Sequence, residues 1–394
     1  MGHFKNHAAG LIAIAIAGWL STPLQAAPFF LGLGDLPGGS VDILAAPLGN
    51  AISRDGAVVV SRGNSDNGFE TFRWTQAGGL QGLGDIAGGD FFSQPNATSA
   101  DGAAVVGEGR SASGTEAFRW TQAGGMQGLG DLAGGIHRSE ALSTSGDGSV
   151  VVGFSVSANG TEAFRWTQTG GMQGLGDLAG GGFQSIAHST SADGLVVVGR
   201  SLSINGLEAY RWTEAGGMQG LGDLAAGGFS SLALSTSADG AVVVGVSETA
   251  DGGEAFRWTA AEGMQGLGDL AGGDFQSNAH STSADGSVVV GDSRTATGTE
   301  AFIWDAANGM RLLEDVLVAE FGFDLTGWSR LLSARGVSGD GLVISGFGMR
   351  NGIAEAFVAN MRQGQVSQVS APGALVVFGV GLAGLTWGRR KRAA

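Results

Sequence analysis

Residues 278–304 read NAHSTSADGSVVVGDSRTATGTEAFIW and contain the turn and strand signals that establish the fold class. Its Asp285-Gly286 pair lies between two extended runs, which is the strongest short signal for a β-hairpin. A type I′ turn there requires positive φ at both residues. The run 288–290 (VVV) is typical of a strand buried on both faces. The segment 300–304 (EAFIW) predicts a further strand with its aromatic side chains on one face.

This unit recurs along the chain with a period of 46 residues. One tryptophan marks each copy, at Trp74, Trp120, Trp166, Trp212, Trp258 and Trp304. One aspartate also marks the copies, at Asp85, Asp131, Asp177, Asp223 and Asp269. Residues 30–360 hold seven such units when the partial first and last copies are included. A fixed period in this range indicates a solenoid, a propeller or an array.

Each unit contains four predicted strands. A run of small residues before the Asp-Gly turn forms the inner strand, and the two strands quoted above follow it. A Gly-rich segment such as 264–270 forms the outermost strand. The longest link, such as 271–276, carries the chain to the next unit without a hairpin signature. We therefore predict an all-β protein in which residues 28–362 form a seven-bladed β-propeller of about 46-residue repeats.

The two ends of the repeat array complement each other. The last unit has predicted strands at 333–337, 342–345 and 354–360 but none after them. The first segment, 30–36, is a fourth strand with no unit before it. We expect 30–36 to pair with 354–360 and close the ring, which would cover edges that invite aggregation. The alternative is an open solenoid, which requires polar capping units at both ends.

The composition excludes several classes of protein. The 74 glycines among 394 residues disfavour helices, because an interior Gly costs about 1 kcal/mol relative to Ala. There is no cysteine, which excludes disulfides, thiolate metal sites and Cys nucleophiles. Residues 28–370 hold all 36 acidic residues against 16 arginines. A region with this net charge of −20 repels nucleic acid and anionic lipid, so we expect no nucleic-acid partner.

Both ends of the chain carry targeting features. Residues 1–27 are typical of a signal peptide, and an uncleaved anchor is the alternative. After a linker at 363–370, residues 371–388 are uncharged and would span about 27 Å as a transmembrane helix. The alternative for this segment is a buried soluble helix. The basic tail 389–394 would stay in the cytoplasm, which places the repeats outside it.

The C-terminal segment resembles a PEP-CTERM sorting signal. In that family a Pro-Glu-Pro motif precedes an apolar span and an Arg-rich end. The resemblance rests on the apolar span together with Pro372, Arg389, Arg390, Lys391 and Arg392, although the motif Glu is missing. It implies export in a Gram-negative bacterium and an exosortase-type sorting partner. It also implies at least transient anchoring in the inner membrane.

The repeat itself resembles the HAF-type extracellular repeat family. Residues 116–121 (EAFRWT), 124–132 (GGMQGLGDL), 143–145 (STS) and 150–153 (VVVG) carry the resemblance. The central units repeat these motifs almost verbatim, so the resemblance covers nearly all of residues 30–360. It implies export and a surface or extracellular location, and it brings no defined activity.

The glycines and aspartates that recur from unit to unit are expected to have a structural role. Gly128 and Gly130 form half of a dinucleotide fingerprint, but no helix follows them. We expect the repeated aspartates to bond to backbone within each unit, with calcium binding in each unit as the alternative. His188 and His280 occupy equivalent positions that hold Leu in other units, so we predict no metal site there.

The repeated carboxylates are also better explained by a structural role than by catalysis. Glu116 and its equivalents invite a glycosidase interpretation, but a closed ring has one axis and a catalytic pair should be unique. We expect Glu116 or Arg119 to tie one unit to its neighbour and the repeated tryptophans to pack between units. The sequence therefore predicts no catalytic residue, cofactor or metal ligand.

Sites are better sought where the units differ. The strand order places the links between units and the links between the second and third strands on the same face. The unrepeated candidates for this ligand face are Asp90, Phe91, Phe92, His137, Arg138, Glu140, Arg200, Glu248, Asp274, Arg294, Phe321 and Trp328. An acidic face that bears aromatic residues would suit sugars or a protein partner.

These observations predict an exported, non-catalytic module that binds an extracellular polysaccharide or a surface protein. One alternative is an extracellular carbohydrate-active enzyme, a glycosidase or lyase, that uses unrepeated acids over the axis. A calcium-stabilised structural repeat protein is the second alternative.

Overall fold

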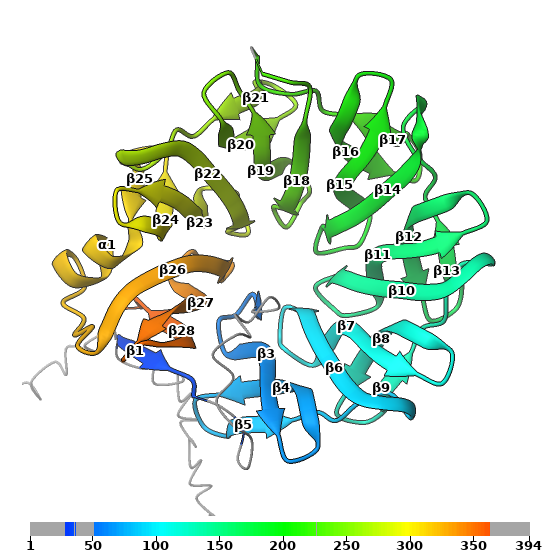
Figure 1. Ribbon diagram of the computed structural model, residues 1–394, viewed down its shortest axis with the longest axis horizontal. Helices are drawn as coiled ribbons and strands as arrows, with labels where there is room; N and C mark the ends of the chain where they lie inside the picture. Colours follow the sequence, from blue (N-terminus) through cyan, green and yellow to red (C-terminus); the bar gives the residue numbers. More distant parts are fainter. Residues whose placement is uncertain (1–27, 35, 37–50, 226, 363–394) are drawn as a thin grey trace, which may run out of the picture. The chain divides into compact units, whose positions relative to one another are not determined.

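The computed structural model describes residues 28–34, 36, 51–225 and 227–362. The predicted signal peptide, linker, transmembrane span, basic tail and sorting residues lie outside the described residues. No helix in the described part of the chain is long and apolar enough to cross a membrane. The described strands form antiparallel sheets arranged around a central axis (Figure 1).

A four-stranded antiparallel sheet is the recurring element. One such sheet consists, in order, of β22 (Gly272–Thr282), β23 (Val288–Thr295), β24 (Gly298–Asp305) and β25 (Gly309–Leu312). β22 lies nearest the axis and β25 lies toward the rim (Figure 1). This is the strand order that the sequence predicts, because short connections place consecutive antiparallel strands side by side.

The other strands repeat this order along the chain. They are β1 (Phe29–Gly32), β2 (Ala51–Ile52), β3 (Val58–Ser65), β4 (Gly68–Thr75), β5 (Gly79–Gly82), β6 (Gly88–Thr98), β7 (Ala104–Ser111), β8 (Gly114–Thr121), β9 (Gly125–Gly128), β10 (Gly134–Thr144), β11 (Val150–Ser157), β12 (Gly160–Thr167), β13 (Gly171–Gly174), β14 (Gly180–Thr190), β15 (Val196–Ser203), β16 (Gly206–Thr213), β17 (Gly217–Gly220), β18 (Ser231–Thr236), β19 (Val242–Glu248), β20 (Gly253–Thr259), β21 (Gly263–Gly266), β26 (Trp328–Val337), β27 (Val343–Arg350) and β28 (Ile353–Asn360). Single parallel pairs between β8 and β10 and between β12 and β14 join three of the sheets.

The inner strands are longer than the sequence predicts. Residues 271–276 are expected to form an unpaired link, but β22 begins at Gly272, which pairs with Thr295. The chain approaches β23 closely because Gly273 has no side chain, and a Cβ there would lie 2.7 Å from the carbonyl carbon of Arg294. A register shift between Gly272 and Ser277 then bends the strand toward the axis.

The Asp-Gly turns differ from the predicted type I′ geometry. Gly286 has a φ of +71°, but Asp285 does not have positive φ. The Asp285 carboxylate accepts hydrogen bonds from the Ser283 hydroxyl at 2.7 Å and from the Ser287 N–H at 3.0 Å. These bonds hold the aspartate in the ordinary backbone region, so only the glycine adopts the left-handed one.

The N-terminal strand completes the last sheet. β1 pairs antiparallel with β28, with Leu31 opposite Val358. The Phe30 ring stacks on the Phe357 ring with centroids 5.4 Å apart. The predicted pairing of the two chain ends is therefore confirmed, although the strand ends at Gly32 and not at residue 36.

A cycle of backbone hydrogen bonds surrounds the axis. In six of the turns the N–H two residues before the glycine donates to a carbonyl of the next sheet, and these residues are Ala100, Gly146, Ala192, Ala238, Ala284 and Gly339. The cycle closes where the Gly339 N–H donates to the Arg54 carbonyl at 2.7 Å and the Asp55 N–H donates to the Ala100 carbonyl at 3.0 Å. A linear stack of sheets could not return to its start, so the closed ring excludes the open solenoid.

The hydrophobic core is divided among the interfaces between neighbouring sheets. Trp120 packs in one cluster with Val58 and Val60 of the preceding sheet. Its neighbour Arg119 donates from Nε to the Gly148 carbonyl of the following sheet at 2.7 Å. Adjacent residues of a strand point to opposite faces, so this dipeptide fastens its sheet on both sides.

Within the described residues one helix, α1 (Leu313–Ala319), interrupts the repeat between β25 and β26. Leu313 and Leu317 are fully buried in a cluster that also contains Phe357. Ile303 joins this cluster where the other central units carry the repeated arginine. The repeat pattern does not predict this helix.

Candidate binding face around the axis

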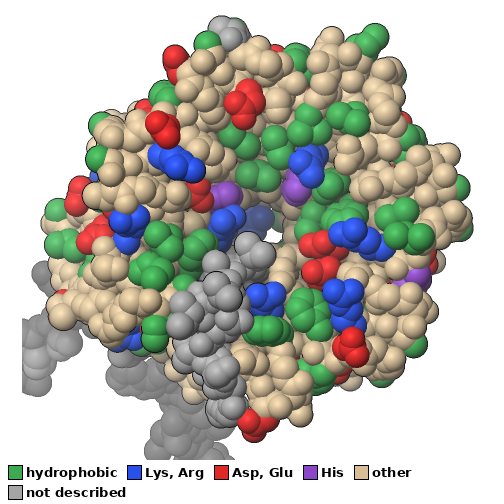
Figure 2. All heavy atoms as spheres, viewed as in Figure 1, with side chains coloured by type: hydrophobic (Ala, Val, Ile, Leu, Met, Phe, Trp, Pro, Cys, Tyr) green, Lys and Arg blue, Asp and Glu red, His purple; other side chains and the backbone are tan. Residues whose placement is uncertain are grey.

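One end of the axis gathers residues that differ between the repeats. Figure 2 shows acidic, basic and histidine side chains around the central hollow on this face. One set of these residues comes directly after the buried valine run and its glycine in successive units. The set consists of Glu108, Phe154, Arg200, Val246 and Asp292. Opposite these residues lie inner-strand residues that also vary, namely Gln94, Glu140, Ile186, Leu232 and Asn278.

Glu108 and Glu140 form a carboxylate pair on this face. Glu108 belongs to β7, whereas Glu140 belongs to β10 of the next sheet. Burial, followed by repulsion from the Glu108 charge, raises the pKa of Glu140 to about 7. Burial also raises the pKa of Glu108, although nearby arginines oppose the shift. The pair can therefore retain a proton at neutral pH, which isolated surface carboxylates do not.

The Glu140 carboxylate is held by a side-chain amide. Asn96 Nδ2 donates to Glu140 Oε1 at 3.1 Å and to the Ala141 carbonyl at 2.9 Å. Asn96 belongs to β6, so this contact crosses from one inner strand to the next. The amide fixes the orientation of the carboxylate by bonding to the backbone beside it.

Three arginines surround the carboxylate pair, and we call Arg62, Arg110 and Arg138 the arginine triad. The charge of each acts to lower the pKa of Glu108. The guanidinium of each lies over a phenylalanine ring, with Arg62 4.9 Å from the Phe69 centroid, Arg110 5.6 Å from that of Phe92 and Arg138 5.7 Å from that of Phe154. Stacking of this kind orients a planar cation. Arg62 also donates from Nη1 to Gln94 Oε1 at 2.7 Å.

A second polar cluster joins β22, β23 and β26. The Asp292 carboxylate accepts hydrogen bonds from His280 at 2.5 Å, from Asn278 at 3.0 Å and from the Ser333 hydroxyl at 2.7 Å. Burial alone would raise the pKa of Asp292, but the bond and charge of His280, followed by the other bonds, bring it to about 2. These hydrogen bonds occupy the Asp292 carboxylate. The bond from Ser333 comes from the neighbouring sheet, so the cluster links two sheets.

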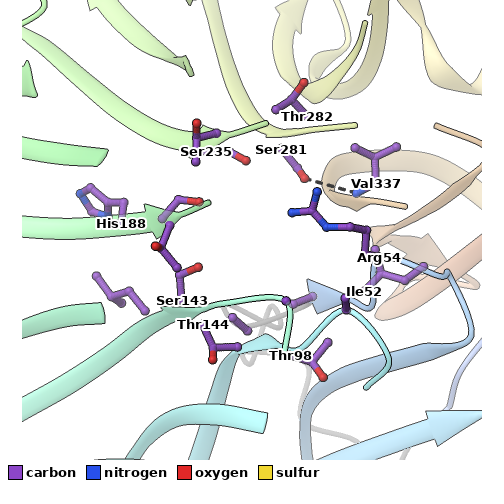
Figure 3. A pocket seen from close by; sticks show the side chains of 18 of the residues that line it. Ile52, Arg54, Thr98, Ser143, Thr144, His188, Ser235, Ser281, Thr282 and Val337 are labelled. Atoms are coloured by element: carbon purple, nitrogen blue, oxygen red, sulfur yellow. Dashed lines mark hydrogen bonds between the residues drawn. The ribbon is translucent and has the colours of Figure 1, made fainter. Parts of the chain in front are cut away.

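The axis contains a cavity of about 180 Å³ (Figure 3). Small polar inner-strand residues line much of it, including Thr98, Ser143, Ser235 and Ser281. Burial, followed by the charge of Arg200, lowers the pKa of the lining residue His188 to about 4, so the ring is neutral at physiological pH. Ligand pockets usually measure at least about 300 Å³, so the cavity is too small for an oligosaccharide.

The structure places most predicted ligand-face residues on strands and not on loops. Asp90, Phe91 and Phe92 belong to β6, His137, Arg138 and Glu140 belong to β10, and Asp274 belongs to β22. The arginine triad and the carboxylate pair bring together Phe92, Arg138 and Glu140. His137 instead contacts the repeated residues Asp131 at 3.0 Å and Glu116 at 3.3 Å.

The arginine triad and the carboxylate pair together form what we call the sector. Phe321 and Trp328 lie apart from it. Both pack against the hydrophobic cluster that α1 covers. The Trp328 ring meets Phe30 of β1 edge to face, with centroids 5.4 Å apart. These aromatic residues therefore help to hold the N-terminal strand in place.

The repeated polar residues bond within the ring. Glu116 Oε1 accepts a hydrogen bond from the Gly130 N–H of its own unit at 2.9 Å, whereas Arg119 reaches the next sheet. The repeated aspartates are half-buried, and Asp131 contacts His137. Across the described ranges no group of three or more His, Asp or Glu residues could hold a metal ion.

Sequence reasoning missed Glu108, Asn96, Arg62 and Arg110. It looked for variation in the links, but these residues vary within strands. For Glu108 the signal was present in the changing residue that follows the buried valine run and its glycine. Only the ring shows that such positions in neighbouring units meet around one axis.

No family model matches the chain, and no curated protein matches it. Among solved structures, the chain is similar to an oligogalacturonate lyase in complex with manganese, at 12% identity over 86% of this chain and 97% of that one, with a TM-score of 0.52. It is also similar to an oligogalacturonate lyase from Vibrio parahaemolyticus, at 11% identity over 86% and 98%, with a TM-score of 0.53.

TolB from Acinetobacter baumannii is another similar structure, at 13% identity over 79% of this chain, with a TM-score of 0.45. The chain spans 65% of the length of that protein. The oligogalacturonate lyases show a likeness of fold alone, a propeller-like ring of antiparallel sheets.

Proposed function

We propose that the chain is an exported, seven-bladed β-propeller that acts as a non-catalytic binding module. Its ligand surface is the axial face that carries the carboxylate pair and the arginine triad. The observation that carries this proposal is a difference in location between repeated and unrepeated side chains. Repeated side chains bond or pack inside the ring, whereas charged, unrepeated side chains gather around one end of the axis (Figure 2).

The shape of this face favours binding over catalysis. Glycosidases enclose the scissile bond between two carboxyl groups, which requires a deep site. The cavity on the axis has a volume of only about 180 Å³, and small polar residues line much of it. A ligand of several sugars would therefore rest on the face, outside this cavity.

The chain ends support a location outside the cytoplasm. We propose that residues 1–27 direct export and that 371–388 hold the protein in the inner membrane, at least until an exosortase-type enzyme acts near Pro372. The repeats would then lie in the cell envelope or outside the cell. The HAF-type resemblance of the repeat supports the same location.

A carbohydrate-active enzyme is the second candidate, and the carboxylate pair favours it. Glu140 has the raised pKa of a general acid, and Glu108 is its acidic neighbour. An enzyme of this kind would release reducing ends from a bound polysaccharide. The Glu140→Gln variant would then bind the polysaccharide normally but release none.

The proposed function is tested by screening the detergent-solubilised full-length chain on arrays of polysaccharides and envelope proteins. Each ligand found is tested again with Arg110→Gln on the axial face and with Glu262→Gln in the exposed turn between β20 and β21. We expect binding to weaken at least tenfold in the first variant and to stay unchanged in the second. Equal binding by both variants, or no binding by the native chain, would contradict an axial ligand surface.

A further inference from the structure

We propose that the ligand is an acidic polysaccharide whose carboxylate groups bind the arginine triad and whose hydroxyl groups bind Glu108 and Glu140. This inference rests on the proposed function, because it assumes that the axial face is the ligand surface. It goes further by naming the chemical class of the ligand and the part of the face that recognises it.

The charge distribution supports an anionic ligand at this sector. Residues 28–370 carry 36 acidic residues and 16 arginines, so most of the surface repels anions. Five of these arginines are repeated and donate to glycine carbonyls inside the ring, namely Arg73, Arg119, Arg165, Arg211 and Arg257. The arginine triad is instead unrepeated and clusters around Glu108.

The arrangement of the arginines suits carboxylates. Arg110 and Arg138 are exposed, and no ion pair of the described residues uses either side chain. Arg110 Nη1 donates to Thr115 Oγ1 at 2.7 Å, which steadies the guanidinium and leaves its other N–H groups for a ligand. A stacked guanidinium presents paired donors that match the two oxygens of a carboxylate.

The carboxylate pair selects against ligands that are anionic throughout. Even with one proton retained on Glu140, the pair offers mainly acceptor oxygens, so it fits a ligand with hydroxyl donors. A polyphosphate or nucleic acid would place further negative charge against them, and the phenylalanine rings nearby are covered by the triad. A chain of uronic acid residues carries carboxylates and hydroxyls at every sugar and matches both halves of the sector.

The sector occurs once in the described residues. Arg294 occupies the register position of Arg110 four repeats later, opposite Thr299 as Arg110 is opposite Thr115. Its Nε donates to Gln276 at 2.9 Å, and the acid of that sheet, Asp292, is already engaged. Arg294, a predicted candidate for the ligand face, therefore lies outside the sector, and its variant is a matched control that removes one arginine without touching the triad.

The test measures binding of the full-length chain in detergent to a polygalacturonate decamer and to the same decamer after reduction of its carboxyl groups. We expect the native chain to bind the reduced decamer at least tenfold more weakly. Arg110→Gln and Arg138→Gln should each weaken binding of the acidic decamer at least tenfold, whereas Arg294→Gln should change it less than twofold.

A pH series provides a second readout. Glu108 on β7 and Arg138 on the same strand are the charged groups that act on Glu140. Arg110 on β7 and Arg62 on β3 act on Glu108 beside it. Loss of the Glu140 proton between pH 6 and 8 adds a negative charge, so affinity for the acidic decamer should fall across this range. The Glu140→Gln variant should bind with little dependence on pH.

Equal affinity for the two decamers, or equal effects of Arg110→Gln and Arg294→Gln, would overturn the inference. If a neutral polysaccharide binds and Arg110→Gln weakens it, the axial face remains the ligand surface and only the acidic class is wrong. If no saccharide or protein depends on the axial face, the proposed function fails as well.

Discussion

In the five central units a single glycine after the buried valine run determines how the inner strand packs on its neighbour. At Gly199 an added Cβ would overlap the Ile186 carbonyl oxygen, and the equivalent glycines meet the same obstacle. The bulge in each inner strand brings its backbone into this space. The glycine thereby sets the position of the next residue, which is the variable residue of the axial face.

We expect Gly199→Ala to lower the free energy of unfolding by about 3 kcal/mol, because the atom it meets is backbone and cannot rotate away. Urea unfolding of the full chain measures this change. Gly182→Ala is the control, since a Cβ there would make only an ordinary contact at 3.7 Å with Leu202. Equal stability of the two variants would show that the inner strand can shift.

The buried hydroxyl of Tyr210 costs stability. Tyr210 replaces a repeated phenylalanine, is fully buried, and its hydroxyl has no hydrogen-bond partner among the described residues. We expect Tyr210→Phe to stabilise the protein by about 1–2 kcal/mol, because it removes an unsatisfied polar group. The reciprocal Phe164→Tyr should destabilise it by a similar amount. Thermal unfolding of both variants checks this, and a loss of stability in Tyr210→Phe would contradict it.

Glu140 makes stability depend on pH near neutrality. Its pKa is about 7 in the folded protein against 4.5 ordinarily, so between these values the folded state holds more protons than the unfolded state. Stability from this group is therefore lost as pH rises from about 5 to 7.5. We expect the urea midpoint to fall over that range in the native chain and to fall less in Glu140→Gln. Parallel curves would argue against the raised pKa.

At the scale of strands, one arginine per unit connects neighbouring sheets. Arg165 on β12 donates from Nε to the Gly194 carbonyl in the turn before β15 at 3.1 Å. The adjacent Trp166 packs in the cluster on the other side with Val106 of the preceding sheet. The strand thus carries polar and apolar contacts on opposite faces, as its alternation requires.

We expect Arg165→Gln to cost about 1–2 kcal/mol, because it leaves a partly buried carbonyl without its charged donor. The exposed Arg294→Gln should change stability by less than about 0.5 kcal/mol. Guanidinium unfolding of both variants makes the comparison. Equal stability would assign the junction to packing alone.

At the scale of the whole molecule, β1 holds the two ends of the ring together. Phe30 contacts Phe357 and Trp328, whereas Leu31 on the same strand is 43% exposed. We expect Phe30→Ala to cost about 2–3 kcal/mol and Leu31→Ala less than about 1 kcal/mol. Limited proteolysis should cut the Phe30→Ala ring faster near the N-terminus. Similar behaviour of the two variants would show that closure does not depend on this contact.

The sequence predicted the strand order and the pairing of the chain ends because both follow from short sequence patterns. The valine runs, the Asp-Gly turns and the spacing of 46 residues are present in many copies, so errors in one unit are corrected by the others. The missing fourth strand after residue 360 and the surplus strand near Phe30 left one way to pair. The sequence did not predict the turn geometry, the inner-strand length or α1. The turn depends on side-chain hydrogen bonds to Asp285, the strand length on the close approach of Gly273 to β23, and α1 on burial against Phe357.

The repeat, the strand order and the residues that differ between copies can all be recognised in the sequence. The meeting of Glu108 and Glu140 beside three arginines depends on the ring, which brings strands of different sheets to one axis. The pKa of about 7 for Glu140 depends on the ring as well, because burial and neighbouring charge set a pKa and neither is visible along the chain.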